Sequence, residues 1–208
     1  MNYRITGTGS CIPDITKKNS DFLENKFLDT DGGKFQSSNS EIIDKFNSIT
    51  GINERRYAPD EINCSDLAAV AAGLAIKDSK LDQETLDYII VAHNTGDISC
   101  SSGQVDTLPS VASKVKAKLK IKNPNCVAYD IICGCPGWVE GIIQAKSFIK
   151  SGMAEKCLVI GCDTLSRILD ENDRDSMIYA DGSGAIVLES DNSYDGGILS
   201  HKSATFTY

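Results

Sequence analysis

The sequence predicts an α/β fold built on a mixed, mostly parallel β-sheet, and two observations support this. Segments with the apolar periodicity of helices alternate with short apolar runs typical of strands, in the order βαβαβαββ. These runs lack the alternation of polar and apolar residues that a half-exposed strand shows, so we expect helices to cover both faces of the sheet. Right-handed crossovers would then join the parallel strands.

The N-terminal part is expected to contribute one strand and an insertion. Residues 3–9 have a strand pattern. The region that follows, at about residues 17–50, is polar and rich in Gly and Asp, which is typical of loops. It has room for a short helix near residues 21–28, and residues 41–47 suit a second helix. We therefore expect a loop and helical insertion ahead of the main α/β pattern.

Beyond this insertion the helices and strands are marked more sharply. Ser65 can cap the first helix, Pro109 suits the first turn of the second, and Gly152 would end the third. Helices are expected at residues 65–77, 109–120 and 136–151, and strands at residues 86–92, 126–131, 156–161 and 184–189. The third helix is apolar over a wide arc and should be covered on more than one side.

Charge and composition limit the class of protein. The net charge is −8, from 21 Lys and Arg against 29 Asp and Glu, and the basic residues are scattered rather than clustered as a nucleic-acid surface requires. No segment approaches the roughly 20 apolar residues of a membrane span. The N-terminus also lacks the pattern of a secretory signal. We expect a cytoplasmic protein that binds neither nucleic acid nor a membrane.

The eight cysteines are expected to be reduced, since no secretory signal is present. Cys126, Cys157 and Cys162 lie in apolar, strand-like runs, where a free cysteine behaves as a small hydrophobic residue. Zinc is conceivable at the Cys133-Gly-Cys135 pair, but structural zinc sites use wider spacings and a second ligand pair, which the sequence lacks. We expect no metal site.

Cys135 lies where a buried strand is expected to meet a buried helix. A sharp turn of this kind exposes a side chain at the carboxyl end of a sheet, and the amides of a helix N-terminus favour a thiolate there. Such a thiolate can attack a thioester carbonyl. Pro136 would fix the first turn, while Gly134 and Gly137 leave room for a substrate. The residues alone leave open a packed side chain at a tight turn; Cys133, one step back, is interpreted as packed.

The segment at residues 128–138, Ala-Tyr-Asp-Ile-Ile-Cys-Gly-Cys-Pro-Gly-Trp, resembles the active-site segment of β-ketoacyl-acyl-carrier-protein synthase III. Three further segments agree with that family in order and spacing: Thr-Gly-Ile-Asn-Glu-Arg-Arg at 50–56, Leu-Pro-Ser-Val-Ala at 108–112 and Tyr-Ala-Asp-Gly-Ser-Gly-Ala at 179–185. The resemblance extends over nearly the whole chain and makes Cys135 the acylated nucleophile. It also implies substrate contacts for Thr50, Arg55 and Leu108.

The resemblance implies a thiolase-like fold, in which two βαβαβαββ halves stack as five layers, and a homodimer. It implies an acyltransferase of fatty-acid or related polyketide biosynthesis, with acyl carrier protein as a partner and no resident cofactor. Cys135 would take an acyl group from an acyl-coenzyme A or acyl-carrier-protein thioester. The carbanion of a decarboxylating malonyl thioester would then attack the acyl-enzyme. Another thiolase-fold enzyme, or a non-catalytic binding or dimerisation subunit, remains an alternative.

The chain departs from the family in two respects. The family's catalytic His and Asn lie in its second half, so residues 1–208 are interpreted as an N-terminal domain, incomplete for condensation, that a C-terminal half or a partner chain completes. His93 and His201 stand in no matching motif, and His93 is expected to be packed or at a rim. The Trp and Arg that clamp coenzyme A in the family are replaced by Lys45 and Ile49, which favours a carrier-protein donor.

Overall fold

The computed structural model describes residues 2–207, and its centre is a five-stranded sheet in the order β1-β9-β8-β4-β7. The strands are β1 (Tyr3–Cys11), β4 (Tyr88–His93), β7 (Val127–Ile132), β8 (Lys156–Thr164) and β9 (Asp181–Ser190). The β8–β4 and β4–β7 pairs are parallel, whereas β9 is antiparallel to both of its neighbours. Four of the five strands therefore point the same way, and the prediction of a mixed, mostly parallel sheet is confirmed.

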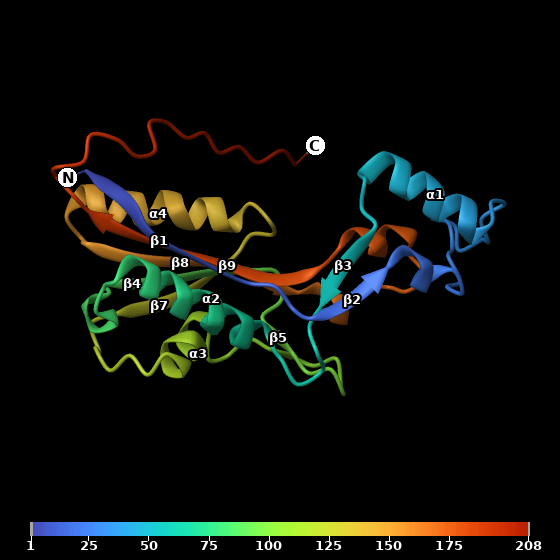
Figure 1. Ribbon diagram of the computed structural model, residues 1–208, viewed down its shortest axis with the longest axis horizontal. Coiled ribbons are helices and arrows are strands. Elements are labelled where there is room, and N and C mark those ends of the chain that lie inside the picture. Colours follow the sequence, from blue (N-terminus) through green and yellow to red (C-terminus); the bar gives the residue numbers. More distant parts are fainter. Residues whose placement is uncertain (1, 208) are drawn as a thin grey trace.

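Helices cover both faces of this sheet (Figure 1). Helices α2 (Cys64–Ser79) and α3 (Val111–Lys118) lie on one face, and α4 (Gly137–Ser151) lies on the other. Each face has its own hydrophobic core, and strands β4 and β8 between them are buried almost throughout. This is the reason that their sequences are apolar without alternation.

Residues 15–57 form an arm that projects from the sheet (Figure 1). Its elements are β2 (Ile15–Lys18), the 3-10 helix η1 (Asn19–Phe22), α1 (Asn39–Thr50) and β3 (Glu54–Tyr57), with β2 antiparallel to β3. Near residues 21–28, where we expected loop around at most a short helix, the η1 turn forms and the chain after it is irregular. Its apolar side chains Phe22, Phe27, Ile42 and Ile43 form a cluster with Met177, which comes from a later part of the chain.

Two expected helix starts are wrong: a distant carboxylate binds the expected cap of α2, and a local cap one residue later starts α3. The N-cap of α2 is Asn63 rather than Ser65, whose hydroxyl instead donates to Asp97 Oδ2 at 2.9 Å. Helix α3 begins after the N-cap Ser110, so Pro109 precedes the helix and follows a cis peptide bond.

The other elements are β5 (Asp97–Ile98), β6 (Val105–Asp106), η2 (Gln83–Thr85), η3 (Leu165–Arg167) and η4 (Arg174–Ile178). In residues 2–207, no helix has both the length and the apolar character needed to cross a bilayer.

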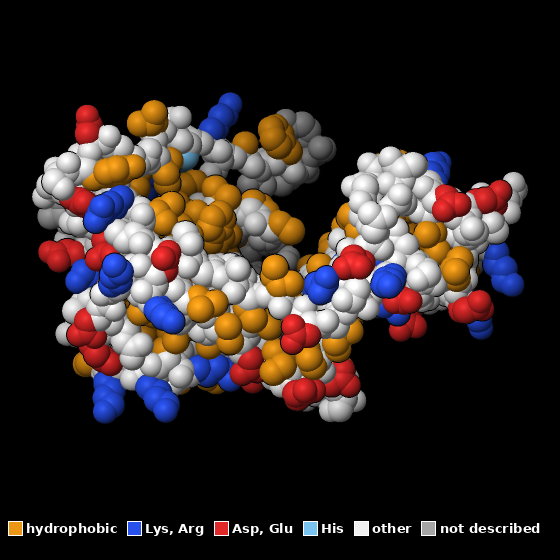
Figure 2. Space-filling view, in the orientation of Figure 1, with side chains coloured by type: hydrophobic (Ala, Val, Ile, Leu, Met, Phe, Trp, Pro, Cys, Tyr) orange, Lys and Arg blue, Asp and Glu red, His pale blue; other side chains and the backbone are white. Residues whose placement is uncertain are grey.

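Helix α4 is covered on a second side by an irregular C-terminal segment, residues 192–207 (Figure 1). Lys146 Nζ donates to the carbonyl of Ile198 at 3.2 Å, which ties this segment to the helix. Part of the helix still faces solvent, since Val139 is 51% exposed. Figure 2 shows a wide hollow between the arm and the body of the molecule, bordered by hydrophobic side chains.

The start of α1 depends on a reciprocal cap. Ser38 Oγ accepts a hydrogen bond from the Glu41 amide at 3.3 Å, and Glu41 Oε2 accepts one from the Ser38 amide at 2.7 Å. Ser38→Ala removes one half of this cap and is expected to lower the free energy of unfolding by about 1 kcal/mol. Urea denaturation measures the loss. The matched control is Ser48→Ala on the same helix, whose hydroxyl only donates to a carbonyl; equal losses would contradict the capping role.

Candidate active site

Cys135 is exposed at the turn between β7 and α4. Gly134 has a φ of 64°, in the left-handed region that glycine tolerates, and its carbonyl accepts a hydrogen bond from the Gly137 amide at 2.9 Å. Pro136 is the N-cap of α4. The thiol therefore lies immediately ahead of the helix N-terminus, as the strand-turn-helix pattern predicted.

Close packing holds this turn against the sheet. A Cβ at Gly137 would lie 3.2 Å from the Cβ of Ala92, at the end of β4. The ring of Trp138 lies on the backbone of β8, where a Cβ at Gly161 would be 3.3 Å from Trp138 Cγ. Because glycine permits both approaches, the first turn of α4 lies directly on the two central strands, and Cys135 is held at their carboxyl ends.

Cys135 opens into a cleft of about 270 Å³. The cleft lies between the start of α4, the ends of β4 and β8, and the start of β9. Its lining residues are Ala92, Gly134, Cys135, Trp138, Gly161, Cys162, Asp163, Ala180, Gly182, Ser183 and Gly184. Two of the segments that carry the family resemblance, 128–138 and 179–185, thus meet in one cleft.

One acidic side chain lines this cleft, and the sequence analysis missed it. Asp163 Oδ1 accepts from the Asn94 amide at 2.9 Å, and Asp163 Oδ2 accepts from Asn94 Nδ2 at 2.7 Å. Burial raises the pKa of Asp163, and the two hydrogen bonds from Asn94 offset this only in part. A Cβ at Gly134 would lie 3.7 Å from Asn94 Oδ1, so the pair also borders the turn that carries Cys135.

A second carboxylate lies behind the turn, on the α3 side of the sheet. Asp130 Oδ2 is 3.0 Å from His93 Nε2 and accepts from the Val111 amide at 2.7 Å, while Asp130 Oδ1 accepts from the Ala112 amide at 2.8 Å. Burial raises the pKa of Asp130, but the hydrogen bonds from His93 and the two amides outweigh it, so the net pKa lies below its usual range. His93 is buried, and the prediction that it is packed is confirmed.

The structure does not bring the three predicted substrate-binding residues into the Cys135 cleft. Thr50 ends α1, in the arm. Arg55 is buried, and its guanidinium donates to Asn19 Oδ1 and to two backbone carbonyls. Leu108, in the loop before α3, is 83% exposed. Their contacts with substrate stay predictions.

Cys133 is exposed, so the prediction that it is packed is wrong. The reason is that β7 is an edge strand, and Cys133 follows its last residue. Cys126, Cys157 and Cys162 are buried as predicted.

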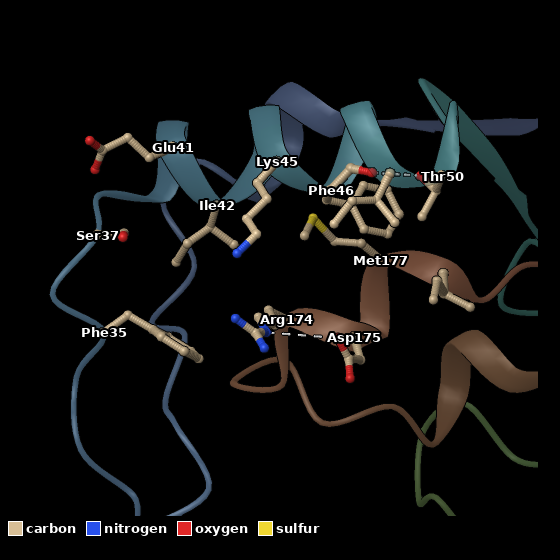
Figure 3. A pocket seen from close by; sticks show the side chains of 12 residues that line it. Phe35, Ser37, Glu41, Ile42, Lys45, Phe46, Thr50, Arg174, Asp175 and Met177 are labelled. Atoms are coloured by element: carbon tan, nitrogen blue, oxygen red, sulfur yellow. Dashed lines mark hydrogen bonds and ion pairs between the residues drawn. The ribbon is translucent and has the colours of Figure 1, made fainter.

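A second cavity, of about 400 Å³, lies between α1 and η4 (Figure 3). Thr50 lines it together with Lys45 and Ile49, the two positions that the resemblance placed at the coenzyme A clamp. Arg174 lies opposite Lys45, and its guanidinium is 4.8 Å from the ring centroid of Phe35. Two acids, Glu41 and Asp175, line the same cavity, and Arg174 Nε lies 3.8 Å from Asp175 Oδ1, so the carboxylates offset part of this positive charge. The sequence analysis missed Arg174 because η4 lies far along the chain.

Comparisons with known proteins agree with this architecture. A family profile described as 3-Oxoacyl-[acyl-carrier-protein (ACP)] synthase III matches residues 129–205. The β-ketoacyl-[acyl-carrier-protein] synthase III of Neisseria gonorrhoeae (strain NCCP11945) is 39% identical over 190 residues, which are 90% of this chain and 52% of the relative. That of Ehrlichia canis (strain Jake) is 42% identical over 161 residues, 76% of this chain and 47% of the relative.

Solved structures show the same relationship. The crystal structure of 3-oxoacyl-[acyl-carrier-protein] synthase III from Aquifex aeolicus VF5 matches with a TM-score of 0.72 and 33% identity, covering 92% of this chain and 55% of that one. The synthase III from Thermus thermophilus matches with a TM-score of 0.70 and 32% identity, covering 89% and 51%. The chain spans about half the length of the relatives that it matches.

Proposed function

We propose that this chain, a relative of the β-ketoacyl-[acyl-carrier-protein] synthases III with their thiolase-like fold, carries the acylated nucleophile of a condensing enzyme. The observation that supports this most directly is the exposed thiol of Cys135, held at the N-terminus of α4 and opening into a cleft. Its sulfur attacks an acyl thioester, the carrier thiol leaves, and the acyl group stays on Cys135. The carbanion formed when a malonyl thioester loses carbon dioxide then attacks the acyl-enzyme.

The second step requires hydrogen-bond donors, and within residues 2–207 the cleft lining includes neither histidine nor asparagine, the two residue types that the family resemblance implies for this role. Decarboxylation needs hydrogen-bond donors that stabilise the developing thioester enolate. The lining side chains that the structure describes include the acid Asp163 but no histidine. We propose that a further half or a partner chain, packed over the cleft and the hollow of Figure 2, supplies these donors.

We propose that both coenzyme A thioesters and acyl-carrier-protein thioesters serve as acyl donors. The cavity between α1 and η4 supports the coenzyme A thioesters. Ile49 cannot stack on a base as an arginine does, but Arg174 brings a guanidinium to the same cavity from η4. Lys45, on the opposite wall, would add a charge for a phosphate.

For the assembly, we propose a homodimer through β7. This strand pairs with β4 on one side only, so within the described chain its other edge leaves backbone groups free for a second copy. Exposed Val127 and Ile132 lie on this strand, and exposed Leu108 lies in the loop before α3.

For the localisation, we propose the cytoplasm. All eight cysteines are free, which suits this reducing compartment.

Mass spectrometry of the intact protein tests the first chemical step. After incubation with acyl-coenzyme A or acyl-carrier-protein thioesters, we expect one acyl adduct, which proteolysis maps to Cys135. Free coenzyme A is the control and should give no acyl adduct. An adduct on another cysteine, or none with either donor, would overturn the proposal.

A further inference from the structure

Two buried cysteines meet beneath the Cys135 cleft. Cys64 is the first residue of α2, Cys162 lies near the end of β8, and their sulfur atoms are 2.9 Å apart. Cys64 is 0% exposed and Cys162 is 4% exposed. Within residues 2–207 this is the one thiol–thiol hydrogen bond, although the chain has eight cysteines, all free.

Both thiols are buried, but only Cys162 also borders the Cys135 cleft. Cys64 and Cys162 both belong to the apolar core between α2 and the sheet, and Cys162, which is 4% exposed, also lines the cleft that holds Cys135. The hydrogen bond to Cys64 and burial both raise the pKa of Cys162, so at neutral pH it is a protonated, slow nucleophile. Since so little of Cys162 is exposed, we expect only a small neutral oxidant, and no bulky disulfide reagent, to reach it from the cleft.

We infer that Cys64 and Cys162 form an oxidisable dithiol, a modification site that hydrogen peroxide or a comparable small peroxide converts into an internal disulfide. The Cys162 sulfur attacks one peroxide oxygen, the O–O bond breaks, and the sulfenic acid of Cys162 and one water form. The Cys64 sulfur then attacks the Cys162 sulfur, the S–O bond breaks, and a second water leaves. Two thiols and one peroxide thus give one disulfide and two waters.

The geometry favours this product over a lasting sulfenic acid. The two sulfurs need to approach by less than about 1 Å to reach a covalent S–S distance, so the fold requires only a small adjustment. The bond would link the start of α2 to the end of β8 across 98 residues of sequence. Because Asp163 of the cleft directly follows Cys162, the oxidation state of the pair would also bear on the wall opposite Cys135.

Peptide mapping tests the inference. The reduced protein is first treated with iodoacetamide to block exposed thiols, then with hydrogen peroxide, and is digested without reductant. We expect a peptide pair joined through Cys64 and Cys162, about 2 Da lighter than the sum of the free peptides and lost on adding dithiothreitol. The apparent Tm is expected to rise by roughly 5 °C or more, since the bond restrains a long loop.

Matched variants make the result decisive. Cys162→Ala and Cys64→Ala should each abolish the crosslink, because either one removes a partner. Cys157→Ala, which removes another buried thiol of β8 whose pKa burial raises to about 12, should leave the crosslink intact. Absence of the joined peptides in a correctly folded wild-type protein, or a crosslink that survives in Cys162→Ala, would overturn the inference.

Discussion

The Cys135→Ala variant is expected to take up acyl groups from a thioester at least about 10³-fold more slowly than the wild type, because the attacking atom is gone. The variant should still fold, since Cys135 is exposed and its replacement leaves no cavity. Stopped reactions with a radiolabelled acyl thioester measure the rate. The same change should also remove the fastest phase of alkylation by limiting iodoacetamide.

Cys133→Ala is the matched control for this prediction. Cys133 is also exposed and lies two residues away on the same turn, but it precedes Gly134 and does not line the cleft. We expect its loss to change acyl uptake by less than about threefold. If Cys133→Ala abolishes uptake while Cys135→Ala retains it, the nucleophile is Cys133.

Asp130→Ala is expected to lower the free energy of unfolding by roughly 3 kcal/mol, the largest stability effect that we predict. The carboxylate accepts hydrogen bonds from the Val111 and Ala112 amides at the start of α3 and contacts buried His93. Alanine would leave all three groups without this partner. Urea denaturation at pH 7 measures the loss, with Asp44→Ala, on the exposed side of α1, as the control expected to change stability by less than about 0.5 kcal/mol.

The pH dependence gives a second measurement of the same contact. The folded-state pKa of Asp130 is below its usual range, so its contribution to stability is fully present above the unfolded-state pKa of about 4. It is lost as the pH falls from there through the folded-state pKa. The difference in stability between the wild type and Asp130→Asn should therefore narrow below about pH 4. A difference that stays constant down to pH 2 would contradict a charged Asp130 contact.

Patterns among neighbouring residues predicted the helices and strands that depend on those residues alone. Strands β4 and β8 were found from their apolar runs, and the turn at Cys135 from glycine and proline next to a helical pattern. The contacts that shape the site were missed where they join distant segments. Asn94 donates to Asp163, and Arg174 lines the same cavity as residues of α1. The sequence around these residues gives no signal of either contact.

The arm shows the same limit for structure. Strands β2 and β3 are short and polar, and they pair across about 40 residues, for example Thr16 with Arg56, so neither carries a strand pattern of its own. The start of α2 was misplaced because Asp97, more than 30 residues away, takes the hydroxyl that Ser65 would otherwise use as a cap. Sequence periodicity contains no information about such partners.

The position of β1 at the edge of the sheet has a consequence for synthesis on the ribosome. Among the described residues the one strand beside β1 is β9, so residues 3–11 find no strand partner until residue 190 has emerged, although α2 packs on β1 earlier. The arm waits almost as long, because its apolar cluster needs Met177. The central strands β4, β7 and β8 can assemble earlier, and the pairing of β1 with β9 then closes the sheet last.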